Sequence, residues 1–250
     1  MYHEKRFQVG ARDTDLFGQC RPSSLLDFFQ EAATDAAMAL HVGRAEMIAE
    51  HHMFWMLARM WYRLEQPVFW NDCLTVRTWH RGSKGASMYR DFDLIRDGKT
   101  IGEAVSVWIL ADFTTHKLCR LDALQELEGT SGGKFCKTKL LSKLRVPDIL
   151  APVGERPLCY SDCDINGHVN NVRYADYACD ALQMDRLGSG YFVSSMQLGY
   201  LKECRAGEIL RLFTAESGGV WYAKGDGVEG RTRFDAAVTL SPLDNPPNGA

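Results

Sequence analysis

The sequence contains no long hydrophobic run. No window reaches the roughly 18 uninterrupted apolar residues that a membrane-spanning helix needs, and the first ten residues are polar and charged, unlike the apolar core of a secretory signal. Basic residues are not in excess either, because 29 Lys and Arg are outnumbered by 32 Asp and Glu, for a formal net charge of −3. We therefore expect a cytoplasmic protein with no membrane span and no nucleic-acid partner.

Paired cysteines and common cofactor motifs are also missing. The eight cysteines are scattered, without a Cys-x-x-Cys pair, so we expect free thiols used as small core residues rather than disulfides. There is no zinc-ligand pattern, no Gly-x-x-x-x-Gly-Lys-Ser/Thr phosphate loop and no Gly-x-Ser-x-Gly elbow of an α/β-hydrolase. The sequence therefore predicts neither a metal nor a redox cofactor.

The chain does contain an internal repeat, in which the same order of predicted elements occurs twice. Its composition of 46% apolar and 24% charged residues is typical of a globular protein. Asp15-Leu16-Phe17-Gly18-Gln19 aligns with Asp164-Ile165-Asn166-Gly167-His168 at an offset of 149 residues. Each loop follows a short strand and precedes an amphipathic helical stretch and a run of strand-like segments. A helix packed across an antiparallel sheet in each copy is an α+β plan.

Hydrophobic periodicity gives the elements of each copy. In the first copy we expect a helix capped by Ser23 or Ser24 and running to about Leu40, then strands at 54–64, 73–80, 88–95 and 101–113, with a hairpin turn at 96–99. In the second copy we expect a helix at about 172–182 and strands at 196–202, 209–215, 221–225 and 231–240.

These patterns divide the chain into an N-terminal domain at 1–128, a linker at 129–157 and a C-terminal domain at 158–250. The linker carries the one strongly basic stretch of a slightly acidic protein, made of Lys134, Lys137, Lys139, Lys143 and Arg145. This stretch is either a solvated linker face or a contact for an acidic partner.

The second loop combines several groups that can carry chemistry. Asp164, Asn166, His168 and Asn170 alternate along an extended segment, and Gly167 permits a tight backbone just before a helix. A carboxylate, an amide, an imidazole and the N–H groups of a helix N-terminus suit the attack of water on an acyl group. The alternative is a polar turn that caps the helix, which explains Asn170 well. The residues alone leave both interpretations open.

Two segments carry a resemblance to a known family. The stretch from Tyr160 to Tyr174 resembles the catalytic segment of plant and bacterial acyl-[acyl carrier protein] thioesterases, in which Asp-x-Asn-x-His-x-x-Asn is followed by Tyr and a helix. Tyr200-Leu201-Lys202-Glu203-Cys204 resembles the family's second catalytic segment. The resemblance covers nearly the whole chain. It implies a double hot-dog fold of two tandem units, each a long helix wrapped by an antiparallel sheet, with the sheets joined edge to edge.

The resemblance implies Asp164, Asn166, His168 and Glu203 as the catalytic set. Glu203 or Asp164 would activate the attacking water, and a covalent intermediate at Asp164 stays open. Backbone N–H groups near Gly167 would stabilise the oxyanion. Three further residues are candidates for supporting roles: Asn170, Tyr200 and Cys204. If Glu203 and Cys204 are neighbours on a strand, their side chains face opposite ways, so Cys204 is better explained as a buried thiol than as a nucleophile.

The first copy has Phe17 and Gln19 where the second has Asn166 and His168, so we expect it to be catalytically silent. It is rich in large apolar side chains that either pack a core or line an acyl pocket, and the family resemblance implies that this half sets chain-length preference. These residues are Phe28, Phe29, Met38, Leu40, Met47, Ile48, Met53, Phe54, Trp55 and Met56.

The implied reaction is hydrolysis of fatty acyl-[acyl carrier protein] to free fatty acid and the carrier with its phosphopantetheine thiol. Acyl carrier proteins are acidic, so the basic linker stretch, with Lys202 and Arg205, is the candidate docking surface. An acyl-CoA thioesterase, a hot-dog dehydratase or hydratase, and a non-catalytic fatty-acyl binding protein are the alternatives. Chain length, saturation and oligomeric state, whether a monomer with an internal pseudo-dimer or a homodimer, stay open.

Overall fold

The computed structural model describes residues 2–119, 124, 127, 130, 140–186 and 190–244. The chain divides into two compact units. Unit 1 comprises Met1–Gln8, Asp27–Tyr62 and Asp72–Ser142, and unit 2 comprises Val9–Leu26, Arg63–Asn71 and Lys143–Ala250. None of the helices in the described part of the chain has the length and apolar character needed to cross a membrane.

The sheet of unit 1 has the strand order β1-β3-β4-β5-β2. Its strands are β1 (His3–Gln8), β2 (Met53–Leu64), β3 (Cys73–Lys84), β4 (Ser87–Arg96) and β5 (Lys99–Asp112), and the short β6 (Leu118–Cys119) pairs with β5. The pairs β1–β3, β3–β4 and β4–β5 are antiparallel. Asp97 and Gly98 both have positive φ, as the tight turn of the predicted hairpin requires.

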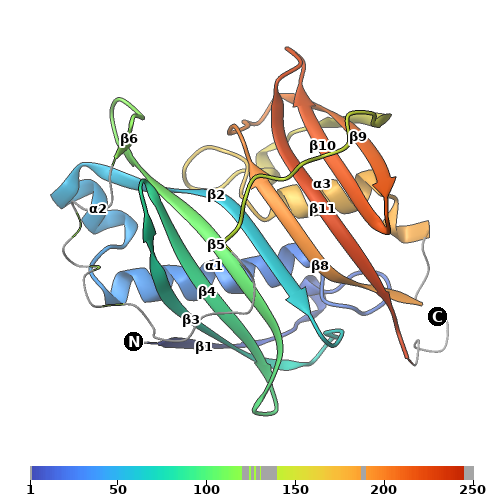
Figure 1. Cartoon of the computed structure of the whole chain (residues 1–250), viewed down its shortest axis with the longest axis horizontal. Coiled ribbons are helices and arrows are strands. Elements are labelled where there is room, and N and C mark those ends of the chain that lie inside the picture. Colours follow the sequence, from blue (N-terminus) through green and yellow to red (C-terminus); the bar gives the residue numbers. More distant parts are fainter. Residues whose placement is uncertain are drawn as a thin grey trace. The chain divides into compact units, whose positions relative to one another are not determined.

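Two helices accompany this sheet. The long α1 (Pro22–Ala39) crosses one face of it (Figure 1), where the Phe29 ring lies 5.2 Å from the Phe92 ring of β4. The predicted serine cap is wrong, because α1 already begins at Pro22 and both serines lie in its first turn. Proline fits the first helical position, where its fixed φ suits the helix and no N–H is required. The short α2 (Arg44–His51) was not predicted.

Unit 2 repeats the same plan. Its strand order β7-β9-β10-β11-β8 matches that of unit 1, with β7 in the place of β1. The strands are β7 (Ala151–Pro157), β8 (Tyr191–Tyr200), β9 (Ile209–Ser217), β10 (Val220–Gly227) and β11 (Thr232–Pro242), and α3 (Arg173–Ala181) lies against their sheet (Figure 1). Tyr174 of α3 packs on the fully buried Phe234 of β11, with ring centroids 5.2 Å apart. The predicted α+β duplication is confirmed.

The predicted linker is wrong at its C-terminal end. Its last seven residues form β7, which pairs antiparallel with β9. The segment contains Pro152, Gly154 and Pro157 and is mostly exposed, so it has the composition of an edge strand and no alternating apolar pattern to reveal it. Residues 129 and 131–139 of that linker lie outside the described residues.

The two aligned loops adopt the same turn, and both belong to unit 2. In the first, the Asp15 N–H donates to the Gln19 carbonyl at 2.8 Å, and in the second the Asp164 N–H donates to the His168 carbonyl at 2.9 Å. A 3₁₀ helix precedes each turn, at Ala11–Asp13 and at Tyr160–Asp162. The offset of 149 residues read from the sequence is therefore a structural equivalence.

We predict that Gly18→Ala and Gly167→Ala destabilise the protein to a similar extent. Both glycines have φ of +74° with no atom within 4 Å of an added Cβ, so only the backbone is strained. A non-glycine residue in the left-handed region costs roughly 1–2 kcal/mol. Thermal unfolding measures the loss, and Gly190→Ala, in equally open space without a positive φ, is the control. Unchanged melting temperatures for the first two variants would contradict the prediction.

Candidate active site

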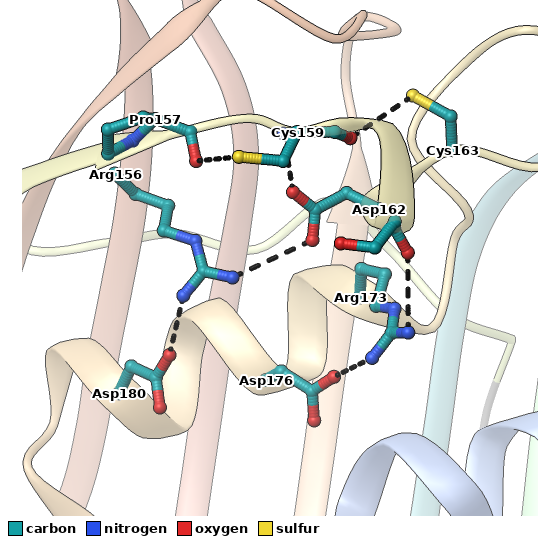
Figure 2. A network of polar contacts seen from close by, with 9 residues as sticks. Arg156, Pro157, Cys159, Asp162, Cys163, Arg173, Asp176 and Asp180 are labelled. Carbon is teal, nitrogen blue, oxygen red and sulfur yellow. Dashed lines mark hydrogen bonds and ion pairs between the residues drawn. The ribbon is translucent and has the colours of Figure 1, made fainter.

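An ion-pair network holds the chain just before the second loop (Figure 2). Asp162, only 6% exposed, accepts a hydrogen bond from the Cys159 N–H at 2.7 Å. Its other oxygen lies 3.6 Å from the Arg156 guanidinium, which also pairs with Asp180 of α3 at 3.1 Å. Arg156 therefore links the end of β7, the 3₁₀ helix and α3.

A second arginine ties the same helix to the same segment. Arg173, the first residue of α3, donates to the Ser161 carbonyl at 3.4 Å and pairs with Asp176 at 3.2 Å (Figure 2). The loop is thus anchored on both sides, by the 3₁₀ helix before it and by α3 after it.

One backbone hydrogen bond brings the two sequence motifs together. The Val169 N–H donates to the Cys204 carbonyl at 2.8 Å. Beside this bond, Nε2 of His168 lies 3.2 Å from Oε2 of Glu203. The two residues are 35 positions apart in the chain, and the family resemblance implies both as members of the catalytic set. The structure thus brings one side chain of each motif into contact.

Arg205 also contacts both members of this pair. Its Nη2 lies 3.2 Å from Nε2 of His168 and 3.5 Å from Oε1 of Glu203. With Nε2 unprotonated, the ring accepts a hydrogen bond from Arg205, and with Nε2 protonated it donates to Glu203. The side chains of His168, Glu203 and Arg205 are 26%, 45% and 64% exposed, so the cluster is open to a substrate.

The Asp164 carboxylate faces its own loop. Its Oδ1 accepts a hydrogen bond from the Asn166 N–H at 2.8 Å. The equivalent Asp15 Oδ1 accepts from the N–H groups of Phe17 and Gln19 at 2.9 and 3.0 Å. Because the aspartate shapes the turn even in the copy without the imidazole, loop formation is sufficient reason for its presence in both copies.

The backbone N–H of Gly167 does not have the role of oxyanion donor that we expected for it. It donates to the Asp164 carbonyl at 3.0 Å, so it is already used inside the turn and does not face an incoming oxyanion. The N–H of His168 differs, because among the hydrogen bonds within residues 140–186 and 190–244 it donates to no acceptor. It is the better candidate for an oxyanion donor.

Asn170 and Asn166 play different parts. Oδ1 of Asn170 accepts a hydrogen bond from the Val172 N–H at 3.1 Å, which forms a turn just before α3. The predicted cap is wrong, because the N-cap residue is Val172 and no side chain caps the helix. Asn166 is exposed at the tip of the loop, where its amide can reach a ligand.

The strand that we expected to carry Glu203 and Cys204 ends earlier. β8 stops at Tyr200, so neither residue lies on a strand. Their exposures still differ as predicted, because Cys204 is completely buried, and burial raises the pKa of its thiol. Tyr200 packs edge-on against Tyr174 with ring centroids 5.8 Å apart. Cys204 and Tyr200 therefore lie among the packing residues behind the site.

The first loop has a different set of side chains at the equivalent positions. Gln19, buried, uses its amide to donate to the Tyr191 carbonyl at 2.8 Å. The Cys20 N–H donates to the Val68 carbonyl at 2.8 Å, as Val169 does to Cys204, which places Pro67 where the second copy has Glu203. This match is not apparent from the sequence, because the spacing between the two segments differs in the two copies.

The predicted docking residues are only partly described. Lys134, Lys137 and Lys139 lie outside the described residues, while Lys143 and Arg145 are exposed. Lys202 lies 4.0 Å from Glu229, and Arg205 belongs to the cluster around His168. Among the described residues, no group of three or more His, Cys, Asp or Glu side chains could hold a metal ion.

Comparison with known proteins gives two family matches and several relatives. Residues 1–125 match the Acyl-ACP thioesterase N-terminal domain, and residues 155–237 match the Acyl-ACP thioesterase C-terminal domain. The chloroplastic dodecanoyl-[acyl-carrier-protein] hydrolase of Umbellularia californica is 26% identical over 212 residues, covering 78% of this chain and 54% of that protein. The chloroplastic palmitoyl-acyl carrier protein thioesterase of Arabidopsis thaliana is 28% identical over 187 residues, covering 70% and 44%. The chain thus spans about half the length of these relatives.

Solved structures show the same fold. An acyl-ACP thioesterase from Bacteroides thetaiotaomicron has a TM-score of 0.86 at 23% identity, covering 96% of this chain and 98% of that chain. The 12:0-ACP thioesterase from Umbellularia californica has a TM-score of 0.81 at 20% identity, covering 97% and 98%. The expected double hot-dog fold is confirmed. With one domain model matched in each half and most of the sequence covered, the chain belongs to the acyl-ACP thioesterase family.

Proposed function

We propose that this protein hydrolyses fatty acyl thioesters carried on acyl carrier protein and releases free fatty acid. The observation that carries the proposal is the contact of His168 with Glu203 at 3.2 Å, which joins the two motifs that resemble the family's catalytic segments. Water is the only co-substrate needed, without a metal or redox cofactor, and the cytoplasm is the expected compartment.

In the proposed mechanism, Glu203 is the base. Its carboxylate takes a proton from water as the water oxygen attacks the thioester carbonyl carbon. The oxyanion that forms accepts a hydrogen bond from the His168 N–H, with the Asn166 amide beside it. The C–S bond then breaks, and the proton held by Glu203 returns to the departing phosphopantetheine sulfur. His168 positions Glu203 through its Nε2, and Asp164 holds the turn that presents both groups.

This division of labour predicts unequal effects of two amide substitutions. Glu203→Gln removes the base and lowers kcat by about 10²–10⁴-fold, the usual contribution of general base catalysis. Asp164→Asn keeps the turn's acceptor oxygen and lowers kcat by only about tenfold, or roughly 1.4 kcal/mol. Steady-state hydrolysis of an acyl-[acyl carrier protein] panel measures both.

The matched control is Asp15→Asn, which alters the equivalent acceptor in the first loop, where Oδ1 accepts two backbone N–H groups, and leaves the catalytic groups untouched. It should cost at least as much stability as Asp164→Asn and preserve turnover. If Asp164→Asn were the more damaging to kcat, Asp164 would be the base. If neither Asp164→Ala nor Glu203→Ala lowered turnover by about tenfold, the proposed site would be wrong.

Cys204 should be dispensable for chemistry. Its complete burial and raised thiol pKa keep it protonated, and a protonated thiol is a poor nucleophile. We expect Cys204→Ala to keep kcat within about threefold, with a loss of roughly 1 kcal/mol of stability from the deleted buried sulfur. Loss of activity in a variant that retains its melting temperature would reinstate the thiol as a nucleophile.

Docking of the acidic carrier predicts a KM effect. Reversing the charge of Lys137, Lys139 and Lys143 to Glu should raise the KM for the carrier substrate at least about fivefold, roughly 1 kcal/mol, with little change in kcat. The control reverses three exposed lysines elsewhere, Lys84, Lys99 and Lys117, with the same change in net charge. An unchanged KM in the first variant would remove this surface from the proposal.

Three alternatives are separated by substrate. Matched kcat/KM values for acyl-CoA and acyl-carrier thioesters decide between the two thioesterase activities. Double-bond hydration or dehydration of the acyl chain without thiol release would indicate a hot-dog hydratase or dehydratase. Binding without release of a free thiol would indicate a fatty-acyl binding protein.

A further inference from the structure

The segment that carries Glu203 lies outside the sheet. β8 ends at Tyr200 and β9 begins at Ile209, so residues 201–208, all of them described, form the connection between these two strands. A catalytic carboxylate has to be held within about 0.5 Å of its working position. Because the connection has no strand partner along these residues, other groups must fix its backbone.

Arg233 lies at a β-bulge where β8 ends. Between β10 and β11, Gly225 pairs with Phe234 and Asp226 pairs with Thr232, so Arg233 is an extra residue in β11. An extra residue at a bulge interrupts the alternation of side chains and gives its own side chain a new direction. Arg233 is only 7% exposed although it is charged. The bulge therefore brings a buried guanidinium to the end of the sheet.

Arg233 binds the 201–208 connection through both its backbone and its side chain. Its carbonyl accepts hydrogen bonds from the N–H groups of Leu201 and Lys202 at 2.9 and 3.1 Å. Its Nη1 donates to the backbone carbonyl of Glu203 at 3.3 Å. One residue thus holds three consecutive residues of the connection, and the last of them is the proposed base.

Two carboxylates hold the Arg233 guanidinium. Its Nη2 lies 3.1 Å from Oε2 of Glu208 and 3.0 Å from Oε1 of Glu229. The other oxygen of Glu208 accepts a hydrogen bond from the Arg205 N–H at 3.2 Å, so the far end of the connection is bound to the same guanidinium through Glu208. Lys202 lies 4.0 Å from Oε1 of Glu229. The charges of the cluster therefore balance, with two acids beside two bases.

The shape of a guanidinium suits this cluster. Its planar fork presents several N–H groups in fixed directions, so Nη1 binds the Glu203 carbonyl while Nη2 binds the two carboxylates. Gly227 of β10 leaves room for the fork, because an added Cβ would lie 2.7 Å from Nε of Arg233 and would also meet the Glu229 carboxylate. The position of the guanidinium thus depends on a neighbouring glycine as well as on its ion pairs.

We propose that Arg233 is a positioning residue of the active site, whose guanidinium fixes the backbone of Glu203 so that the carboxylate meets His168. This role rests on the proposed function, because it concerns the base of the proposed hydrolysis. Arg233 transfers no proton and acts through the Glu203 backbone. Its loss should affect kcat more than KM, because misplacing a reacting group by about 1 Å can cost about 10²-fold in rate.

A double-mutant cycle between Arg233 and Glu203 tests the proposal. Arg233→Lys keeps the charge and removes the fork, and should lower kcat for an acyl-[acyl carrier protein] at least about tenfold while KM stays within about threefold. In the Glu203→Gln background the base is already absent, so the same substitution should lower the residual kcat by less than about threefold. Equal losses in the two backgrounds would indicate a general structural role and overturn the proposal.

Arg81→Lys is the matched control for the loss of a buried ion pair. The Arg81 side chain of β3 is 8% exposed, as that of Arg233 is, and it pairs with the buried Asp91 at 3.1 Å. Both substitutions disturb a buried guanidinium, but Arg81 belongs to unit 1, and its variant should preserve kcat. A matching loss of kcat in Arg81→Lys would attribute the effect to lost stability and contradict the positioning role.

Gly227→Ala displaces the guanidinium without removing it, and it carries the test if Arg233→Lys fails to fold. The added Cβ meets the ends of two flexible side chains, and the φ of Gly227 is not positive, so the backbone can stay as it is. We expect kcat to fall about threefold or more. Gly190→Ala, in open space, is the control and should keep kcat. Full activity of Gly227→Ala in the absence of a folded Arg233→Lys would overturn the proposal.

Glu203→Gln separates this role from the proposed function. If Glu203→Gln loses hydrolysis while Arg233→Lys and Gly227→Ala keep kcat, the base stands and the role of Arg233 is wrong. If Glu203→Gln keeps full hydrolysis, the proposed base is wrong and the role of Arg233 falls with it.

Discussion

The hydrogen bond from the Val169 N–H to the Cys204 carbonyl is the contact on which the active site depends. It joins the loop that leads into α3, which contains His168, to the segment that follows β8, which contains Glu203. Each segment contains only one of the two motifs. Each end is held by stronger elements: the loop by Arg156 and Arg173, and the second segment by the Arg233 carbonyl, which accepts from the N–H groups of Leu201 and Lys202 at 2.9 and 3.1 Å. The 2.8 Å bond between these two anchored segments lies directly beside the contact of His168 with Glu203.

Duplication separates the residues that both loops share from those that only the second loop has. The aspartate, the glycine with φ of +74° and the closing backbone bonds occur in both copies, so they form the turn. The imidazole and the carboxylate of Glu203 occur only in the second. Comparison within one chain therefore gives Asp164 a structural reason shared by both copies, and it leaves His168 and Glu203 as groups that only the second copy has.

Much of the fold was predictable because hydrophobic periodicity and turn residues are local signals. Most strands of both sheets, α3 and the offset between the loops follow from such signals. β7 was missed because an exposed edge strand with two prolines has no apolar alternation. Arg205 was predicted as a docking residue because it is basic and lies beside the second motif. Its contact with His168, 37 positions away, depends on the fold and has no sign in the sequence. The Gly167 N–H was misassigned for a similar reason, since its use within the turn depends on the loop's three-dimensional closure.

The buried amide of Gln19 has a consequence for the history of the two halves. It supplies the donor for the Tyr191 carbonyl, so restoring an imidazole at this position would take that donor away from a partly buried acceptor, at a cost of about 1–3 kcal/mol. An acid at the position equivalent to Glu203 would further require the replacement of Pro67, whose ring fixes the local backbone. The first loop thus helps to hold β8 within unit 2, and a variant with an imidazole and an acid at these two positions would be less stable than the protein as it is.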